Sequence, residues 1–188
     1  MPFAKVGMTV ALAAVLGGLR PALASITATA SVSTSQSSAP FDYTVTLHNT
    51  GDTNIGTFWF AWTAVPRSYD FLPTLPTNIS GPSGWIFPVS NNPTPGDGYG
   101  IEWYNVGGSA IAPGGVGTFH FTSNDSPTTL AGPAFFPPFQ ILNSVVYIGQ
   151  PQTDPGYAFV ATIPGPGGLL PLGVLGVVAA RRRRALIG

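Results

Sequence analysis

Short segments of alternating apolar and polar residues, separated by glycine and proline, constrain the fold of this chain most strongly. The segment 41–48 places its apolar side chains at every second position, which is the period of a half-buried β-strand. Similar patterns predict further strands at 26–32, 55–65, 85–89, 99–104, 117–122, 144–148 and 157–161. No interior stretch shows helical spacing with capping residues. Eight short strands with frequent turn residues favour an all-β domain.

The strand pattern favours an antiparallel, Ig-like β-sandwich of about seven or eight strands. The chain contains no cysteine, so disulfides and thiolate metal sites are excluded and the fold must depend on its hydrophobic core. In the predicted strand 55–65, Phe58, Phe60 and Trp62 share one face, and Trp59 falls on the opposite face. The segments 66–84 and 123–141 are predicted to be long connections.

The formal net charge of zero conceals an acidic central region. Between residues 25 and 162, one basic residue, Arg67, stands against all seven acidic residues of the chain, which gives a net charge of −6. A domain so poor in cations cannot neutralise phosphates, so we expect no nucleic-acid partner. Electrostatic attraction to an anionic membrane surface is not expected for the same reason.

Residues 1–24 have the pattern of a secretory signal peptide. Lys5 precedes an apolar run from Val6 to Leu19, and Ala22 and Ala24 supply the small residues that signal peptidase requires. This pattern predicts an N-terminal signal helix with cleavage before Ser25. The alternative is an uncleaved membrane anchor.

Residues 163–188 contain an apolar segment followed by a basic cluster. The apolar part runs from Gly165 to Ala180, and the cluster consists of Arg181, Arg182, Arg183 and Arg184. As a helix the apolar part would be about 24 Å long at ~1.5 Å per residue, which falls short of a bilayer core of ~30 Å, although the long arginine side chains extend its reach. The arginines would remain on the cytoplasmic side, and the preceding domain would lie outside.

This tail resembles the C-terminal sorting signal of PEP-CTERM proteins, which combines a short proline-containing motif, an apolar helix and a basic cluster. The matching motif is Pro164, Gly165 and Pro166, followed by the helix 169–180. The chain departs from the family pattern in having Gly165 where the family name implies glutamate. The resemblance implies recognition by an exosortase, a membrane enzyme that processes the tail. The alternative is a single-span anchor without processing; a lipid-anchor signal fits less well.

The central region also resembles, distantly, sandwich domains of exported PEP-CTERM proteins and some cellulose-binding modules. The residues that carry this likeness are the Pro-Gly-Gly turn in 111–115, the Phe-x-Phe strand in 119–123 and the segment 126–132.

Candidate chemistry in the central region is sparse. His48 and His120 lie on polar strand faces without a nucleophile motif. Asp97, in a predicted loop, and Glu102, in a predicted edge strand, lie close in sequence and are the candidate carboxylate pair of a glycosidase. Two groups of loop oxygens leave calcium open: Asn49, Asp52 and Asn54, and Asn91, Asn92 and Asp97. We expect no other cofactor.

Aromatic residues suggest two further roles. Trp59, Trp85 and Tyr104 are candidates for stacking on sugar rings, with burial under the long connections as the alternative. The segment Phe135–Phe139 is too apolar for an ordinary exposed loop, so it either caps the sandwich or forms an interaction patch.

Together these features predict three regions: a signal peptide (1–24), a β-sandwich domain (25–162) and a sorting or transmembrane segment (163–188). The leading interpretation is a non-enzymatic, exported protein of the cell surface or extracellular matrix, whose partners are signal peptidase and an exosortase-like enzyme. The tail would hold it in the cytoplasmic membrane before processing. The alternatives are a carbohydrate-binding module with a polysaccharide partner and a membrane-anchored ectodomain without processing. A hydrolase is not strictly excluded.

Overall fold

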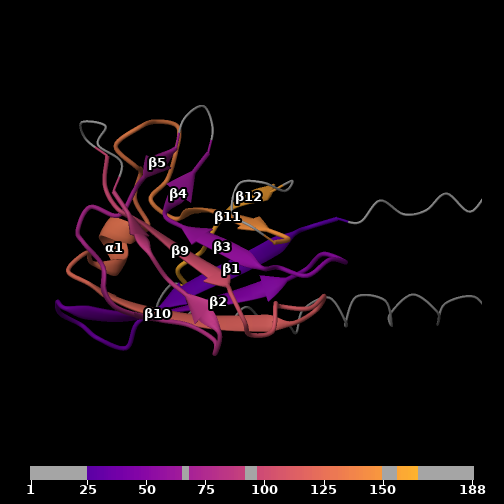
Figure 1. The fold of residues 1–188 in the computed structure, drawn as a ribbon. Helices are drawn as coiled ribbons and strands as arrows, with labels where there is room; N and C mark the ends of the chain where they lie inside the picture. Colours follow the sequence, from indigo (N-terminus) through magenta and orange to yellow (C-terminus); the bar gives the residue numbers. More distant parts are fainter. Residues whose placement is uncertain (1–24, 65–67, 92–96, 150–155, 165–188) are drawn as a thin grey trace, which may run out of the picture.

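The computed structural model describes residues 25–64, 68–91, 97–149 and 156–164, and these residues form mainly antiparallel β-sheets (Figure 1). The predicted all-β class is therefore confirmed at this level. The two predicted terminal helices lie outside the described residues. Among the described residues, no helix combines the length and the apolar character needed to cross a bilayer.

The first sheet has four strands in the order β1-β2-β10-β6. They are β1 (Ala28–Ser33), β2 (Phe41–Asn49), β10 (Val116–Ser123) and β6 (Thr77–Ser80). Buried and exposed residues alternate along most of β2, which matches its sequence pattern. β10 pairs with β2 over its whole length, from Val116 opposite His48 to Ser123 opposite Phe41.

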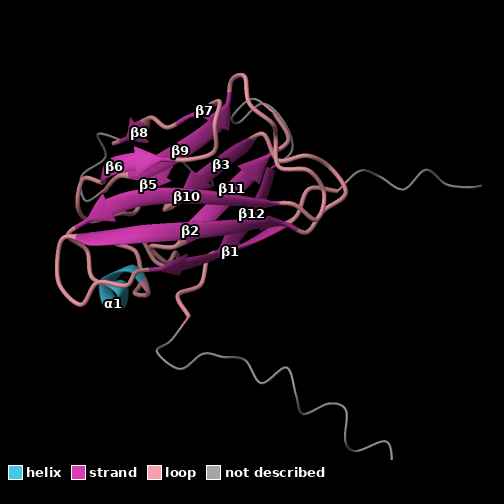
Figure 2. Cartoon of the chain, turned by 90° about the horizontal axis from the view of Figure 1, so that it is seen from below, coloured by secondary structure: helices cyan, strands magenta, loops and turns pink. Residues whose placement is uncertain are grey.

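The second sheet has the order β12-β11-β3-β9-β7, with β8 also paired to β9 (Figure 2). Its members are β12 (Gly156–Val160), β11 (Asn143–Tyr147), β3 (Thr57–Phe60), β9 (Gly100–Asn105), β7 (Trp85–Ile86) and β8 (Val89–Ser90). All these pairings are antiparallel.

The two sheets pack face to face through aromatic side chains. Phe58 of β3 lies 5.3 Å from Phe119 of β10, and Trp103 of β9 lies 5.0 Å from Phe119, as measured between ring centroids. Phe60 and Phe121 make a second contact across the same gap at 5.4 Å. All these rings are essentially inaccessible to solvent, so they form the centre of the hydrophobic core.

The predicted strand 55–65 is interrupted at Ala61, and this interruption changes the face on which Trp62 lies. Ala61 has a φ of 55°, in the left-handed region, and separates β3 from β4 (Trp62–Thr63). Trp62 therefore does not share the face of Phe58 and Phe60, as the alternation predicted. Instead it stacks on Trp59 at 4.4 Å, on the outer side of the second sheet.

The two predicted long connections contain regular structure. The first includes β5 (Tyr69–Asp70), which pairs with β4, and β6, which completes the four-stranded sheet. The second includes α1 (Pro127–Leu130), which Ser126 caps by accepting a hydrogen bond from the Thr129 amide. Both sequence predictions were incomplete because elements of two to four residues leave almost no periodic signal.

The described chain begins just before β1 and ends alongside the second half of that strand. At one end, the Ser25 amide donates to Oδ1 of Asp52 at 2.5 Å. At the other, the Thr162 amide donates to the Ala30 carbonyl at 3.0 Å, and the Val32 amide donates to the Thr162 carbonyl at 2.8 Å.

Trp103→Ala tests the inter-sheet core. The side chain is fully buried, stacks on Phe58 at 5.5 Å and donates from Nε1 to the Ser80 carbonyl at 3.0 Å. We expect a loss of about 3–5 kcal/mol in the free energy of unfolding, measured by chemical denaturation. The control is Val116→Ala, at a side chain that is 53% exposed, which should change the free energy of unfolding by about 0.5 kcal/mol or less. Equal effects of the two substitutions would contradict this core assignment.

Candidate functional site

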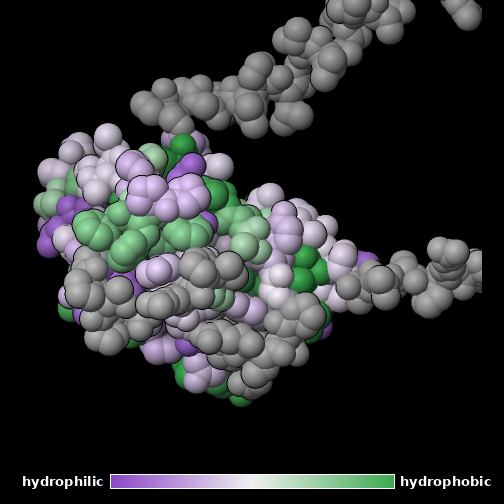
Figure 3. Space-filling model, turned by 90° about the horizontal axis from the view of Figure 1, so that it is seen from above, coloured by the Kyte–Doolittle hydropathy of each residue, from purple (hydrophilic) through white to green (hydrophobic). Residues whose placement is uncertain are grey.

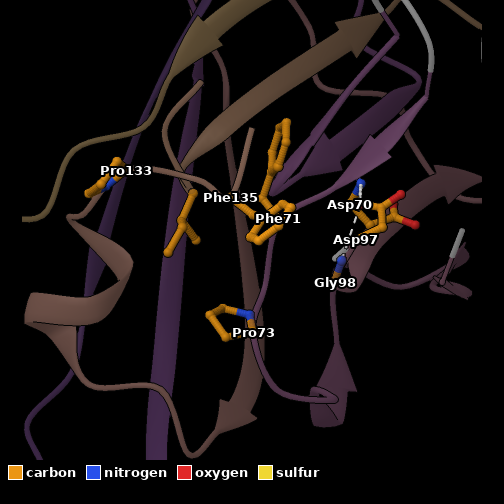
Figure 4. A pocket seen from close by; sticks show the side chains of 8 residues that line it. Asp70, Phe71, Pro73, Asp97, Gly98, Pro133 and Phe135 are labelled. Atoms are coloured by element: carbon orange, nitrogen blue, oxygen red, sulfur yellow. Dashed lines mark hydrogen bonds between the residues drawn. The ribbon is translucent and has the colours of Figure 1, made fainter. Parts of the chain in front are cut away.

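A pocket of about 300 Å³ lies at the end of the domain that carries α1, between β5 and the segment before β11 (Figure 4). Its apolar wall comes from Phe71, Pro73, Pro133, Phe135 and Ile141, and its polar side comes from Asp70, Asp97 and Gly98. This volume is at the lower limit of small-molecule sites.

The two carboxylates of the pocket fix the local backbone. Asp97 Oδ1 accepts hydrogen bonds from the Asp70 amide at 2.6 Å and from the Gly98 amide at 3.1 Å. Asp70 is 2% exposed, and its Oδ1 accepts from the Ser90 hydroxyl at 2.6 Å. In Figure 4 the carboxylate of Asp97 lies on the side away from Pro133. The pocket's acids thus join β5, β8 and the start of β9.

Asp97 has one unusual feature: its Oδ2 is buried and has no hydrogen-bond partner. Burial raises the pKa of Asp97, the neighbouring Asp70 carboxylate raises it further, and the two amide hydrogen bonds oppose these effects. Asp70 was not a candidate in the sequence analysis because it lies in a segment predicted to be a connection. The pairing of Asp97 with Asp70 rather than with Glu102 depends on β5.

The aromatic segment Phe135–Phe139 both covers the end of the domain and exposes a ring. The Phe136 ring lies 4.5 Å from that of Tyr69, and the Phe139 ring lies 5.6 Å from that of Phe71. The Phe135 ring lies 5.0 Å from that of Phe136 but is 72% exposed, the largest exposed fraction among the large hydrophobic residues that the structure describes.

The outer face of the second sheet carries a separate aromatic cluster. Trp59, Trp62, Val145 and Tyr147 form it, and Trp59 lies opposite Glu102 in the register of β3 and β9. Glu102 is 7% exposed, and its Oε1 has no hydrogen-bond partner; the same is true of Nε1 of the buried Trp59. Burial raises the pKa of Glu102 to about 7.

The three predicted sugar-stacking residues do not present a common open surface. Trp59 and Tyr104 lie on the same outer face, but Trp59 is covered by Trp62 and is only 6% exposed. Trp85 lies on the inner face of the sheet, packs against Phe119 at 5.5 Å and is 5% exposed. Tyr104 alone of the three is partly accessible.

Two further candidate side chains, Asn49 and His120, make local contacts in the fold. Asn49 donates to the carbonyls of Thr53 and Ile111 and accepts from the Gly51 amide, so its amide group closes a turn. His120 contacts Thr44 at 3.2 Å, four residues along β10 from the position paired with His48. Within the described ranges, no three histidine or acidic residues gather as a metal site would require. Asn92 lies outside these ranges.

Of the predicted processing residues, Ser25 and Pro164 are described. Ser25 is held in the turn that contains Asp52, and Pro164 follows directly on Ile163, which packs against the core. Ala22, Ala24, Gly165, Pro166 and the four arginines 181–184 lie outside the described residues.

Comparison with known proteins gives little guidance. No protein-family model matches the chain, and no curated protein matches its sequence. One solved structure, the yeast delta-COP-I mu-homology domain, aligns with a TM-score of 0.32 and 18% identity, over 64% of this chain and 38% of that one. The alignment thus spans well under half of that structure, and a likeness of this size supports no argument about fold or function.

Glu102→Gln tests the buried carboxyl group on the outer face. With a folded-state pKa of about 7 against an ordinary value of 4.5, the folded protein retains a proton that the unfolded chain has lost, so stability falls as pH rises through this window. As pH rises through this window, we expect the free energy of unfolding of the wild type to fall by on the order of 2 kcal/mol relative to that of the variant. The measurement is urea unfolding at a series of pH values. Parallel pH profiles would show that Glu102 does not titrate in this range.

Proposed function

We propose that this chain is an exported, non-enzymatic protein of the cell surface or extracellular matrix, whose tail is processed by an exosortase-like enzyme. In this interpretation residues 25–162 form an Ig-like sandwich between a signal peptide and a PEP-CTERM-type sorting segment. One observation supports the proposal: within the described residues, the hydrogen bonds of the domain extend from Ser25 to Thr162, which are the limits that the two sequence signals predict.

The N-terminal boundary agrees with cleavage before Ser25. The Ser25 carbonyl accepts hydrogen bonds from the Asp52 amide at 3.0 Å and from the Thr53 hydroxyl at 3.2 Å. Its own nitrogen faces the Asp52 carboxylate. Cleavage there would convert this nitrogen into an ammonium group whose charge the carboxylate can pair, so the new terminus would be accommodated without rearrangement.

The C-terminal boundary agrees with processing at Pro164–Pro166. Thr162 is the last described residue with a backbone hydrogen bond to β1, and the Ile163 side chain packs against the core. The proline motif begins at the next residue. Removal of the following segment would therefore leave every described sheet contact in place.

The acidic side chains support a structural role for the domain. Asp125 accepts hydrogen bonds at Oδ2 from the amide and hydroxyl of Thr74 and from the Ser123 hydroxyl, which ties two distant segments together. Asp97 and Asp70 connect strands in a comparable way. A carbohydrate-binding role would need a stacking surface other than Trp59 and Trp85, which are buried.

Replacing Pro164, Gly165 and Pro166 together with alanine tests the processing step in the native host. We expect the variant to accumulate as a membrane-bound precursor, because the recognition motif is lost while the apolar segment and the arginines remain. The matched control replaces Gly167 and Gly168 with alanine, which changes the same tail outside the motif and should leave processing intact. The readout is the mass of the protein in membrane and external fractions.

If the triple variant matures as the wild type does, the motif is not the processing signal. If neither the variant nor the wild type is processed, the chain is a membrane-anchored ectodomain, which is the alternative that the same tail allows.

A further inference from the structure

The end of the domain from which the tail leaves carries exposed apolar side chains, and we propose that this end lies against the lipid surface of the membrane while the tail is still attached. The contact would be made by Phe135 and Leu75, which are 72% and 55% exposed. This inference deepens the proposed function and rests on its assignment of the tail as a membrane segment. It assigns a specific orientation to the precursor, which the sorting signal alone does not.

Backbone hydrogen bonds join the Phe135 loop to the strand that leads into the tail. The Ala161 amide donates to the Leu142 carbonyl at 3.0 Å, two residues before Ile163. Directly before Leu142, the Ile141 amide donates to the Gly132 carbonyl at 3.2 Å and closes the loop that contains Phe135. The loop and the tail attachment therefore lie at the same end of the second sheet.

Leu75 is held at this end by a buried carboxylate. The preceding residue, Thr74, donates to Oδ2 of Asp125 from its amide at 3.1 Å and from its hydroxyl at 3.0 Å. Asp125 follows the end of β10, which pairs with the beginning of β2. Seen from above, hydrophobic surface gathers on the left and middle of this face of the molecule (Figure 3).

The length of the connection brings this end close to the bilayer. Between Ile163, the last residue packed on the core, and Leu169, where the apolar helix of the tail is predicted to begin, the chain can span no more than about 20 Å. A tether this short holds the domain at an effective local concentration in the millimolar range, so even a weak apolar contact would be populated.

Charge decides which kind of contact is feasible. The domain has a net charge of −6, so an anionic lipid surface would repel it. At the tail end, however, Asp70 and Asp125 are 2% and 5% exposed and accept hydrogen bonds from within the fold. Asp42, at the start of β2, is exposed at this end, but the large apolar side chains of Phe135 and Leu75 are presented outward as well. Such residues partition into the interface of a zwitterionic bilayer.

The opposite end provides a matched comparison. Val116 is 53% exposed at the start of β10, beside the turn that holds Ser25. Along β2, with nine residues, the two ends are separated by about 30 Å. An apolar side chain at the far end should therefore remain in water while Phe135 touches lipid.

Site-specific labelling of the full chain tests the orientation. Because the protein has no cysteine, Phe135→Cys, Leu75→Cys and Val116→Cys each provide a single thiol for an environment-sensitive fluorophore. The labelled chains are reconstituted into phosphatidylcholine vesicles, with flotation to confirm membrane association. Quenching is then measured with aqueous iodide and with a nitroxide attached to the lipid headgroup.

We expect iodide to quench the labels at 135 and 75 about half as strongly as the label at 116, or less, and the lipid nitroxide to show the reverse order. High salt should not abolish the difference, because the contact is apolar. If the chain floats but all three labels respond alike, the orientation is wrong and the proposed function stands. If the chain does not float, the tail is not a membrane segment, and both proposals fail.

Discussion

The stacking of aromatic rings between the two sheets is the interaction on which the rest of this structure depends. Phe58 contacts both Trp103 and Phe119, and each ring comes from a different strand. With no cysteine in the chain, no disulfide can substitute for this contact. The outer-face cluster, the pocket and the end loops are all attached to strands that this core holds in register.

The strands with clear alternation were predictable, and the elements without it were not. β2 and β10 follow the sequence pattern because each has one buried and one exposed face over several residues. The sequence did not predict β5 or β6. β5 has only two residues, and β6 has four that are mostly exposed, so neither shows an alternation of apolar and polar residues. Trp62 was assigned to the wrong face because the left-handed backbone at Ala61 reverses the alternation. No residue pattern predicts that conformation at an alanine.

The sequence identified only part of the candidate site, because contacts between distant segments leave no local pattern. It identified Asp97 and the Phe135–Phe139 segment as unusual, and both line or cover the pocket at the tail end. It could not identify Asp70 as the partner of Asp97, because their contact depends on the hairpin of β4 and β5. Burial of Trp59 by Trp62 is likewise a tertiary contact, and it removes a ring that the alternation alone would leave available.

The proposed export and processing of the protein agree with the limits of the described domain. Among the described residues, the hydrogen bonds of the domain run from Ser25 to Thr162, so cleavage before Ser25 and after Pro164 would keep every described sheet contact. The most direct test is the intact mass of the protein recovered from its native host, by cell fraction. The account predicts a species outside the cytoplasmic membrane that starts at Ser25 and ends between Pro164 and Gly168. A membrane species that still contains Arg181 to Arg184 would contradict it.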